Sequence, residues 1–174
     1  FEERYRDFRR RLGAALVGEE LAGKYDFEKL ALLYEKGKLV AFLEQQGQGA
    51  MLGGWLGAMA PRFGTRAVTD HNLWPYFARR FGLRLIGFLE PKPGVPPTTR
   101  HLGELIKRMK AQDVPLILAS AYYDPRHADF VARSTGARVV GMANQTGARE
   151  GTDEYLKMID YDVRQIVSAL EARS

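Results

Sequence analysis

Apolar side chains in the first third of the chain recur three or four positions apart, which is the spacing of one face of an α-helix. Asp26 is the expected N-cap of a second helix, Gly37 interrupts that helix, and the period resumes at Leu39. Pro61 ends the pattern. We therefore expect a helical segment over residues 1–62. Its first helix is predicted from the apolar positions Phe1, Tyr5, Phe8, Leu12 and Leu16.

The pattern changes at residue 63, where short apolar runs begin to alternate with amphipathic helices. Asp124 and Pro125 predict the start of one of these helices and Gly136 its end, and Thr152 is the expected cap of the last helix. Strands that alternate with helices form a parallel sheet with right-handed crossovers. Residues 63–174 are therefore predicted to form an α/β domain of three layers, a parallel four-stranded sheet with helices on both faces. The strands are expected at 67–69, 85–89, 116–118 and 139–142.

Composition and charge argue against a nucleic-acid-binding protein and exclude cysteine chemistry. The 174 residues suffice for one domain with a core, and the net charge is +5, from 26 Lys and Arg against 21 Asp and Glu. The basic residues are interleaved with acids and no nucleic-acid-binding motif accompanies them, so we expect no nucleic-acid partner and rank a basic adaptor last. The chain has no cysteine. This excludes disulfides, thiol catalysis and cysteine-bound zinc, so a metal would need His, carboxylate or amide ligands.

Candidate ligands lie in the loops after the strands, because ligands of such sheets bind outside the carboxyl ends of the strands. His71 follows the first strand and opens a helix, and the positive end of that helix disfavours a charged imidazolium. A neutral imidazole can bind a metal, although a His here can also cap the helix or fill the loop. The four loops begin at Asp70, Glu90, Ser120 and Ala143.

Other residues near these loops allow two interpretations each. Tyr122 and Tyr123 either line a cleft or pack against neighbours, and Asp124 is either an N-cap or a ligand. His101 and His127 are expected to be exposed helix residues. No pair of histidines has the spacing of a zinc protease.

A glycine-rich stretch offers an alternative function. Gly47, Gly49 and Gly53, with Asp70 about 20 residues on, resemble a variant dinucleotide-binding loop. Such a loop needs a strand directly before the glycines, whereas residues 39–46 have helical spacing. This spacing disfavours the loop, and we keep a nucleotide-binding Rossmann-like oxidoreductase, or a metal-assisted hydrolase, as the alternative hypothesis of an enzyme.

Several motifs occur in an order that resembles one known family. Residues 68–77, Val-Thr-Asp-His-Asn-Leu-Trp-Pro-Tyr-Phe, are followed by Arg-Phe-Gly-Leu at 80–83. The proline-rich loop 90–97, the loop Tyr-Tyr-Asp-Pro-Arg at 122–126 and the helix start at 152–156 follow in sequence. This order is similar to that of the ABC-transporter solute-binding proteins specific for zinc and manganese, in which a helical backbone joins two α/β lobes. The resemblance covers roughly residues 63–172.

The resemblance implies that this chain is the C-terminal lobe of such a receptor, not an enzyme, and that residues 1–62 include part of the helix between the lobes. It implies that His71 is a metal ligand. Family members also use two His of the first lobe and an Asp in the loop after the last strand. This chain has Asn144 in that loop, so Tyr123, Asp124 and Asn144 are the candidate cleft-lining or substitute ligands.

The resemblance also implies a cargo and partners. The transported ligand is expected to be a divalent metal, zinc ahead of manganese because manganese prefers more carboxylate ligands. The expected partners are an ABC transporter permease in the membrane and the missing N-terminal lobe of the same protein. That lobe would precede Phe1, which starts the chain inside a helical pattern. The expected location is periplasmic or at the cell surface, with a lipid anchor as one form of the full-length protein.

Overall fold

The computed structural model describes residues 2–92 and 94–172. Phe1 of the predicted first helix, Pro93 of the predicted loop and residues 173–174 lie outside the described residues. The chain forms two compact units. The helical unit runs to Phe63 and includes Arg79–Gly82, and the α/β unit comprises Gly64–Ala78 and the residues from Leu83 onward.

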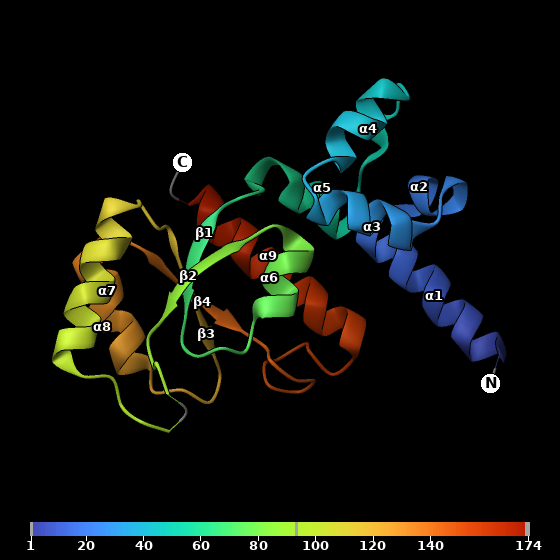
Figure 1. The fold of residues 1–174 in the computed structure, drawn as a ribbon. Helices are drawn as coiled ribbons and strands as arrows, with labels where there is room; N and C mark the ends of the chain where they lie inside the picture. Colours follow the sequence, from blue (N-terminus) through green and yellow to red (C-terminus); the bar gives the residue numbers. More distant parts are fainter. Residues whose placement is uncertain (1, 93, 173–174) are drawn as a thin grey trace. The chain divides into compact units, whose positions relative to one another are not determined.

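The helical unit has the all-helical character that its sequence predicts (Figure 1). Asp26 caps α3 by accepting a hydrogen bond from the Glu28 N–H at 2.9 Å, and Gly37 breaks the chain after α3 with a φ of +67°. The helices are α1 (Glu2–Val17), α2 (Glu19–Lys24), α3 (Phe27–Glu35), α4 (Leu39–Gln45) and α5 (Gly54–Met59), with 3-10 helices η1 (Gly49–Met51) and η2 (Ala60–Arg62).

The glycine-rich stretch does not follow a strand. The residues before Gly47 form α4, as their spacing predicts, and the glycines lead into η1 and α5. A dinucleotide-binding loop needs a strand at this position so that the turn can present its amides to a pyrophosphate. The oxidoreductase alternative therefore loses its basis.

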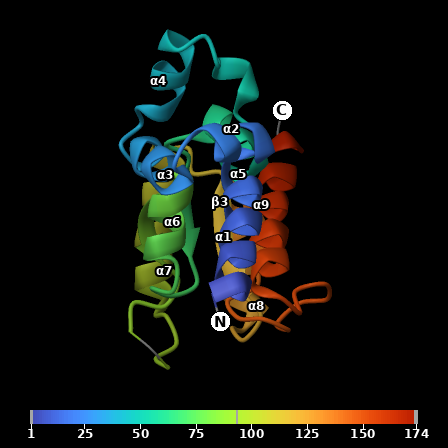
Figure 2. The ribbon, with the colours of Figure 1, turned by 90° about the vertical axis from the view of Figure 1, so that its right-hand side faces the viewer.

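The α/β unit confirms the predicted three-layer fold. Its four strands are parallel and lie in the order β2-β1-β3-β4. Figures 1 and 2 show α7 and α8 on one face of the sheet and α6 and α9 on the other. The strands are β1 (Arg66–Thr69), β2 (Arg84–Phe88), β3 (Leu116–Ser120) and β4 (Arg138–Met142), and the helices are α6 (Pro75–Phe81), α7 (Thr99–Ala111), α8 (Pro125–Thr135) and α9 (Tyr155–Glu171).

The core of this unit lies against the central strand β3. Leu116, Ile117 and Leu118 have no exposed surface, as expected for a parallel strand covered by helices on both faces. Leu105 of α7 and Val131 of α8 pack in the same buried cluster as Ile117. This packing fixes the loops at the carboxyl ends of the strands, where ligands of such sheets bind.

The predicted helix boundaries are correct at α8 and wrong at α9. Asp124 accepts the Arg126 N–H at 2.9 Å, Pro125 is the first helical residue, and Gly136 ends α8 in the left-handed conformation. Thr152 does not cap α9, which begins at Tyr155. The Thr152 hydroxyl is buried and bonds instead to the backbone of Arg149, so a turn comes before the helix. Within the described part of the chain, no helix has the length and apolarity needed to cross a membrane.

Two side chains of α7 cover the outer edge of β2. The carbonyl oxygen of Ile86 accepts a hydrogen bond from Arg108 Nη1 at 3.1 Å, and that of Phe88 lies 2.9 Å from His101 Nε2. His101 was expected to be exposed, but it is half-buried because its ring reaches back to this strand. An edge strand with free carbonyls is a template for pairing with another chain, so these contacts protect the edge.

The double variant His101→Ala and Arg108→Ala is expected to self-associate as its concentration rises. It should also lose about 1 kcal/mol of stability for each lost hydrogen bond. Light scattering across a dilution series would measure the association. The control replaces the exposed α7 residues Arg100 and Lys107 by alanine and should remain monodisperse. Equal behaviour of the two double variants would contradict the edge-protection role.

Candidate metal centre

Three of the predicted loops meet around His71. Its Nδ1 lies 3.1 Å from the carbonyl oxygen of Glu90, which follows β2. Its ring also lies beside that of Tyr123, which follows β3, with ring centroids 6.2 Å apart. The side chain is half-buried. The sheet order explains this meeting, because β1 lies between β2 and β3.

The contact with Glu90 fixes the tautomer of His71. A carbonyl oxygen can only accept a hydrogen bond, so Nδ1 must carry the proton. In the neutral tautomer that carries this proton, Nε2 is unprotonated and its lone pair can bind a metal, which is the usual arrangement of a metal-binding His. The sequence analysis expected a helix to begin at this residue. His71 does not open a helix, since a turn separates it from α6, which begins at Pro75.

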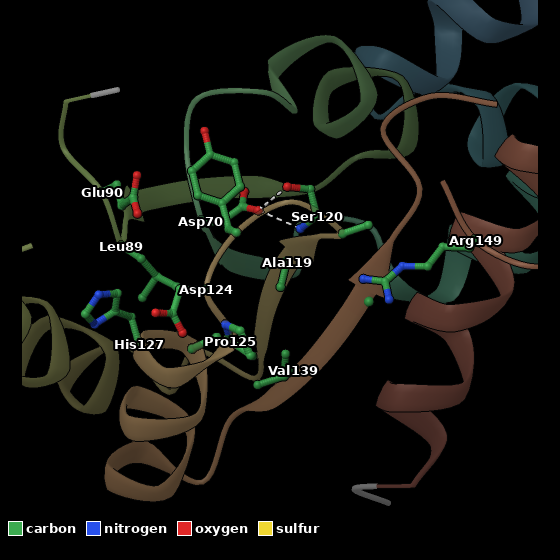
Figure 3. Close-up of a pocket in the computed structure, with 14 residues that line it drawn as sticks. Asp70, Leu89, Glu90, Ala119, Ser120, Asp124, Pro125, His127, Val139 and Arg149 are labelled. Carbon is green, nitrogen blue, oxygen red and sulfur yellow. Dashed lines mark hydrogen bonds between the residues drawn. The ribbon is translucent and has the colours of Figure 1, made fainter. Parts of the chain in front are cut away.

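Asp70 holds the backbone beside His71. Its side chain is buried, and Oδ1 accepts the His71 N–H at 2.7 Å. Oδ2 accepts both the N–H and the hydroxyl of Ser120 at 2.5 Å (Figure 3). Asp70 thereby ties the end of β1 to the end of β3 and limits the positions that the His71 ring can take. No local sequence pattern predicts this role, because Ser120 is 50 residues away from Asp70.

Tyr123 borders the same site as a neutral phenol. Burial raises the pKa of its hydroxyl, and the negative charges of Asp70 and Glu90 raise it further. The hydroxyl therefore stays protonated at neutral pH. It can accept or donate a hydrogen bond, but it does not supply negative charge to a cation.

Asp124 makes several local interactions. In addition to capping α8, it accepts hydrogen bonds from the Arg126 guanidinium, with Nε 3.0 Å from Oδ1 and 2.8 Å from Oδ2. These hydrogen bonds lower the pKa of Asp124 to about 2. The carboxylate lies in the wall of a cavity that Tyr123 also lines. Its role as a substitute ligand stays a prediction.

Asn144 has a buried acceptor that no donor satisfies. Among the described residues, its Oδ1 has no hydrogen-bond partner. A buried amide oxygen without a donor is costly unless a ligand, water or cation binds there. Asn144 follows β4 and His71 follows β1, and β3 lies between these strands. No contact joins Asn144 to His71 in the part of the chain that the structure describes.

Asp162 holds the start of the loop that contains Asn144, and the sequence analysis did not identify it. It lies on α9 with 1% of its surface exposed, and Oδ1 accepts the Ala143 N–H at 2.7 Å. Its Oδ2 has no partner among the described residues. Burial raises the pKa of Asp162 to about 7, although the Ala143 N–H and the Arg149 charge oppose the shift. The signal was the spacing of 158, 162 and 166, which places a carboxylate on the apolar face of the last helix.

These residues do not form a complete metal site by themselves. In the described ranges, no group of three or more His, Asp and Glu side chains is arranged to hold a metal ion. His71 offers one nitrogen donor and Asn144 offers one oxygen donor. Zinc in proteins usually takes four ligands, or three with water. The donors present fit part of a divalent-metal site.

Solved structures share this fold. The manganese complex of the solute-binding protein FpvC from Pseudomonas aeruginosa is 19% identical, with a TM-score of 0.55 over 82% of this chain and 58% of that protein. A mutant of the laminin-binding adhesin Lmb from Streptococcus agalactiae is 25% identical, with a TM-score of 0.56 over 87% of this chain and 50% of the adhesin.

A third structure extends the comparison. A manganese-bound mutant of the periplasmic metal binding protein from Candidatus Liberibacter asiaticus is 18% identical, with a TM-score of 0.53 over 87% of this chain and 52% of that protein. The chain therefore spans between 50% and 58% of the lengths of these three proteins.

The sequence itself matches a family model over residues 56–169, which is more than half of the chain and includes the whole sheet. The matched segment contains His71, Tyr123, Asp124 and Asn144. The model describes the periplasmic component A of a zinc-uptake complex. This chain therefore belongs to the ZnuA family, which is described as the periplasmic component A of zinc-uptake complexes.

Proposed function

We propose that this chain is the C-terminal lobe of an extracytoplasmic solute-binding protein that binds a divalent metal and delivers it to an ABC importer. Membership in the zinc-uptake family and the likeness to metal-bound solute-binding proteins support this function. The partial coverage of those proteins supports a second lobe that supplies further ligands. We assign residues 63–174 to the metal-receptor lobe and residues 1–62 to a helical segment that includes part of the connection between lobes.

The observation that carries this proposal is the hydrogen bond that sets the tautomer of His71. Its Nδ1 donates to the Glu90 carbonyl, so its Nε2 is free to bind a metal. Asp70 holds the backbone next to the ring, so little conformational freedom is lost when the metal binds. A nitrogen donor favours zinc over manganese, which prefers carboxylate and water ligands. We therefore propose zinc as the cargo.

Asn144 is the best supported of the substitute ligands. Its Oδ1 is buried and lacks a donor, whereas both oxygens of Asp124 already accept hydrogen bonds from Arg126. A metal at Asp124 would have to displace that guanidinium. Tyr123 is neutral at physiological pH, so we assign it a place in the wall of the cleft.

The variant His71→Ala is expected to bind zinc at least about tenfold more weakly than the wild type. Isothermal titration of untagged, metal-stripped protein with zinc chloride would measure both affinities. The wild-type chain itself should bind weakly, because the described residues supply only part of a ligand set. Manganese should bind the wild type more weakly than zinc.

The matched control is His127→Ala, since His127 lies in the first turn of α8, half-buried and not exposed as expected, and no hydrogen bond or ring contact joins it to His71 among the described residues. Its zinc affinity should equal that of the wild type. An unchanged affinity in the His71 variant would remove this site assignment. Equal affinities for zinc and manganese would remove the choice of cargo.

A further inference from the structure

The loop between β4 and α9 carries Asn144 and begins at a residue that is fully buried (Figure 1). Ala143 has 0% of its surface exposed, so its backbone N–H is removed from water. Among the described residues, this N–H donates to Asp162 Oδ1 at 2.7 Å. A buried N–H without an acceptor costs about 1–3 kcal/mol, so this hydrogen bond fixes the start of the loop.

The acceptor is held by the packing of α9 and not by the loop. Asp162 lies 19 residues after Ala143 in the chain, on a helix that packs against β4. Its neighbours Val163 and Ile166 are buried, so the apolar face of α9 keeps this part of the helix against the sheet. The carboxyl group therefore cannot follow the loop if the loop moves, and it acts as a fixed point for the Ala143 N–H.

The remainder of the loop is closed by its own hydrogen bonds. The Gly147 N–H donates to the Thr152 carbonyl at 2.7 Å, and the buried Thr152 hydroxyl donates to the Arg149 carbonyl at 2.7 Å. Arg149 Nε donates to the Met142 carbonyl at 3.3 Å, which joins the turn to the end of β4. None of these hydrogen bonds involves Asn144, so they close the loop without setting the position of that residue.

Asn144 is the residue that the anchored peptide carries. It follows Ala143 directly, so any movement of the Ala143 backbone displaces Asn144 with it. Its Oδ1 is buried and has no donor among the described residues, which leaves this oxygen available to a cation. One hydrogen bond and one peptide unit therefore connect the fixed carboxyl group of Asp162 to the best supported substitute ligand.

We propose that Asp162 is a positioning residue for metal binding, which acts through the Ala143 N–H to hold Asn144 where its side chain meets the cation. This inference rests on the proposed function and adds to it a residue of α9 that is not itself a ligand. Residues that orient the ligands of a metal typically change its affinity about 10- to 100-fold when they are replaced. The role needs only an acceptor oxygen, so an amide in place of the carboxyl group fulfils it as well.

Isothermal titration of the metal-stripped chain with zinc chloride tests the role of the acceptor. Asp162→Leu keeps the branched shape but removes the acceptor, and it should weaken zinc binding at least about tenfold. Asp162→Asn keeps an acceptor oxygen and should bind zinc like the wild type. The control Asp160→Leu removes an exposed carboxylate of the same helix and should also bind like the wild type. Circular dichroism checks folding, and Asp162→Ala replaces the leucine variant if that variant does not fold.

A double-mutant cycle separates positioning from a general loss of structure. Asn144→Ala should weaken zinc binding by itself. Adding Asp162→Leu to that variant should cause no further loss, because the ligand that Asp162 positions is already absent. Additive losses would overturn the proposal, since Asp162 would then act by a route that does not include Asn144.

Hydrogen exchange of the metal-free protein gives a readout that needs no zinc. The Ala143 amide should exchange at least about tenfold faster in Asp162→Leu than in the wild type, whereas the amide of Leu118 in the central strand should change far less. Equal exchange at Ala143, or wild-type zinc affinity in folded Asp162→Leu, would overturn this inference alone. Absence of zinc binding by the wild type would overturn the proposed function together with it.

Discussion

Replacing Gly54 by alanine is expected to destabilise the protein by at least about 3 kcal/mol. Gly54 has a φ of +58°, which an L-residue with a side chain adopts only with strain. A Cβ at this position would also stand 2.4 Å from the Ala15 carbonyl oxygen and 2.9 Å from the Leu16 carbonyl carbon. Both of these atoms are backbone, so no side-chain rotation relieves the overlap. The start of α5 would have to separate from the end of α1.

Urea unfolding followed by circular dichroism at 222 nm would measure this loss. The matched control is Gly23→Ala in α2, where a Cβ meets nothing within 4 Å and the glycine is exposed. Alanine there should stabilise the helix by about 0.5 kcal/mol, because it lowers the entropy of the unfolded chain. A Gly54→Ala variant within about 1 kcal/mol of the wild type would contradict the close backbone approach.

This close approach also accounts for Gly53 and Gly54 of the glycine-rich stretch that was considered as a dinucleotide-binding loop. The Gly53 N–H donates to the Val17 carbonyl at 3.1 Å, and a Cβ at Gly18 would lie 3.3 Å from the Gly53 Cα. The glycines allow the backbones at the end of α1 and the start of α5 to touch. The glycine content alone does not show whether the space beside these glycines is used by a ligand or by another segment of the same chain.

Local signals in the sequence predicted most of the fold correctly. Asp124, Pro125 and Gly136 mark the ends of α8 because capping and left-handed turns depend on residues within a few positions. The four apolar runs became the four strands because a buried parallel strand needs a continuous apolar sequence. The prediction that Thr152 caps the last helix was wrong because a Thr hydroxyl can also form hydrogen bonds within a turn. In the structure, the Thr152 hydroxyl bonds to the backbone of Arg149.

The candidate site depended on contacts that no local pattern contains. His71 was identifiable from its place after a strand, but its tautomer depends on the Glu90 carbonyl, 19 residues away. The support from Asp70 depends on Ser120, on another strand. Residue types suggest chemistry, whereas the sheet order decides which of them meet.

The variant Asp162→Asn is expected to be more stable than the wild type at pH 8, by about 2 kcal/mol. The folded-state pKa of Asp162 is raised from its ordinary 3.8 to about 7, so the folded protein holds this proton more tightly than the unfolded chain does. As the pH rises above about 4, the unfolded chain ionises first and gains stability. The free energy of unfolding therefore falls between about pH 4 and pH 7, and the loss is complete above pH 7.

Asparagine removes this penalty because it carries no charge, and its oxygen can still accept the Ala143 N–H. The full shift corresponds to about 4 kcal/mol, and the loss of attraction to Arg149 and the burial of an amide reduce the net gain. Urea unfolding of both proteins at pH 4, 6 and 8 would measure the effect. The stability advantage of the variant should be large at pH 8 and should shrink toward pH 4.

The matched control for this prediction is Asp160→Asn, two residues earlier on α9. Asp160 is 38% exposed and forms an ion pair with Arg164 at 2.9 Å. An exposed pair of this kind contributes little, so its loss should change the stability by less than about 0.5 kcal/mol at every pH. If Asp162→Asn were destabilised equally at pH 4 and pH 8, the carboxyl would be ionised in the folded protein throughout. Asp162 would then act as a charged anchor for the loop that holds Asn144, and not as a buried acid that retains its proton.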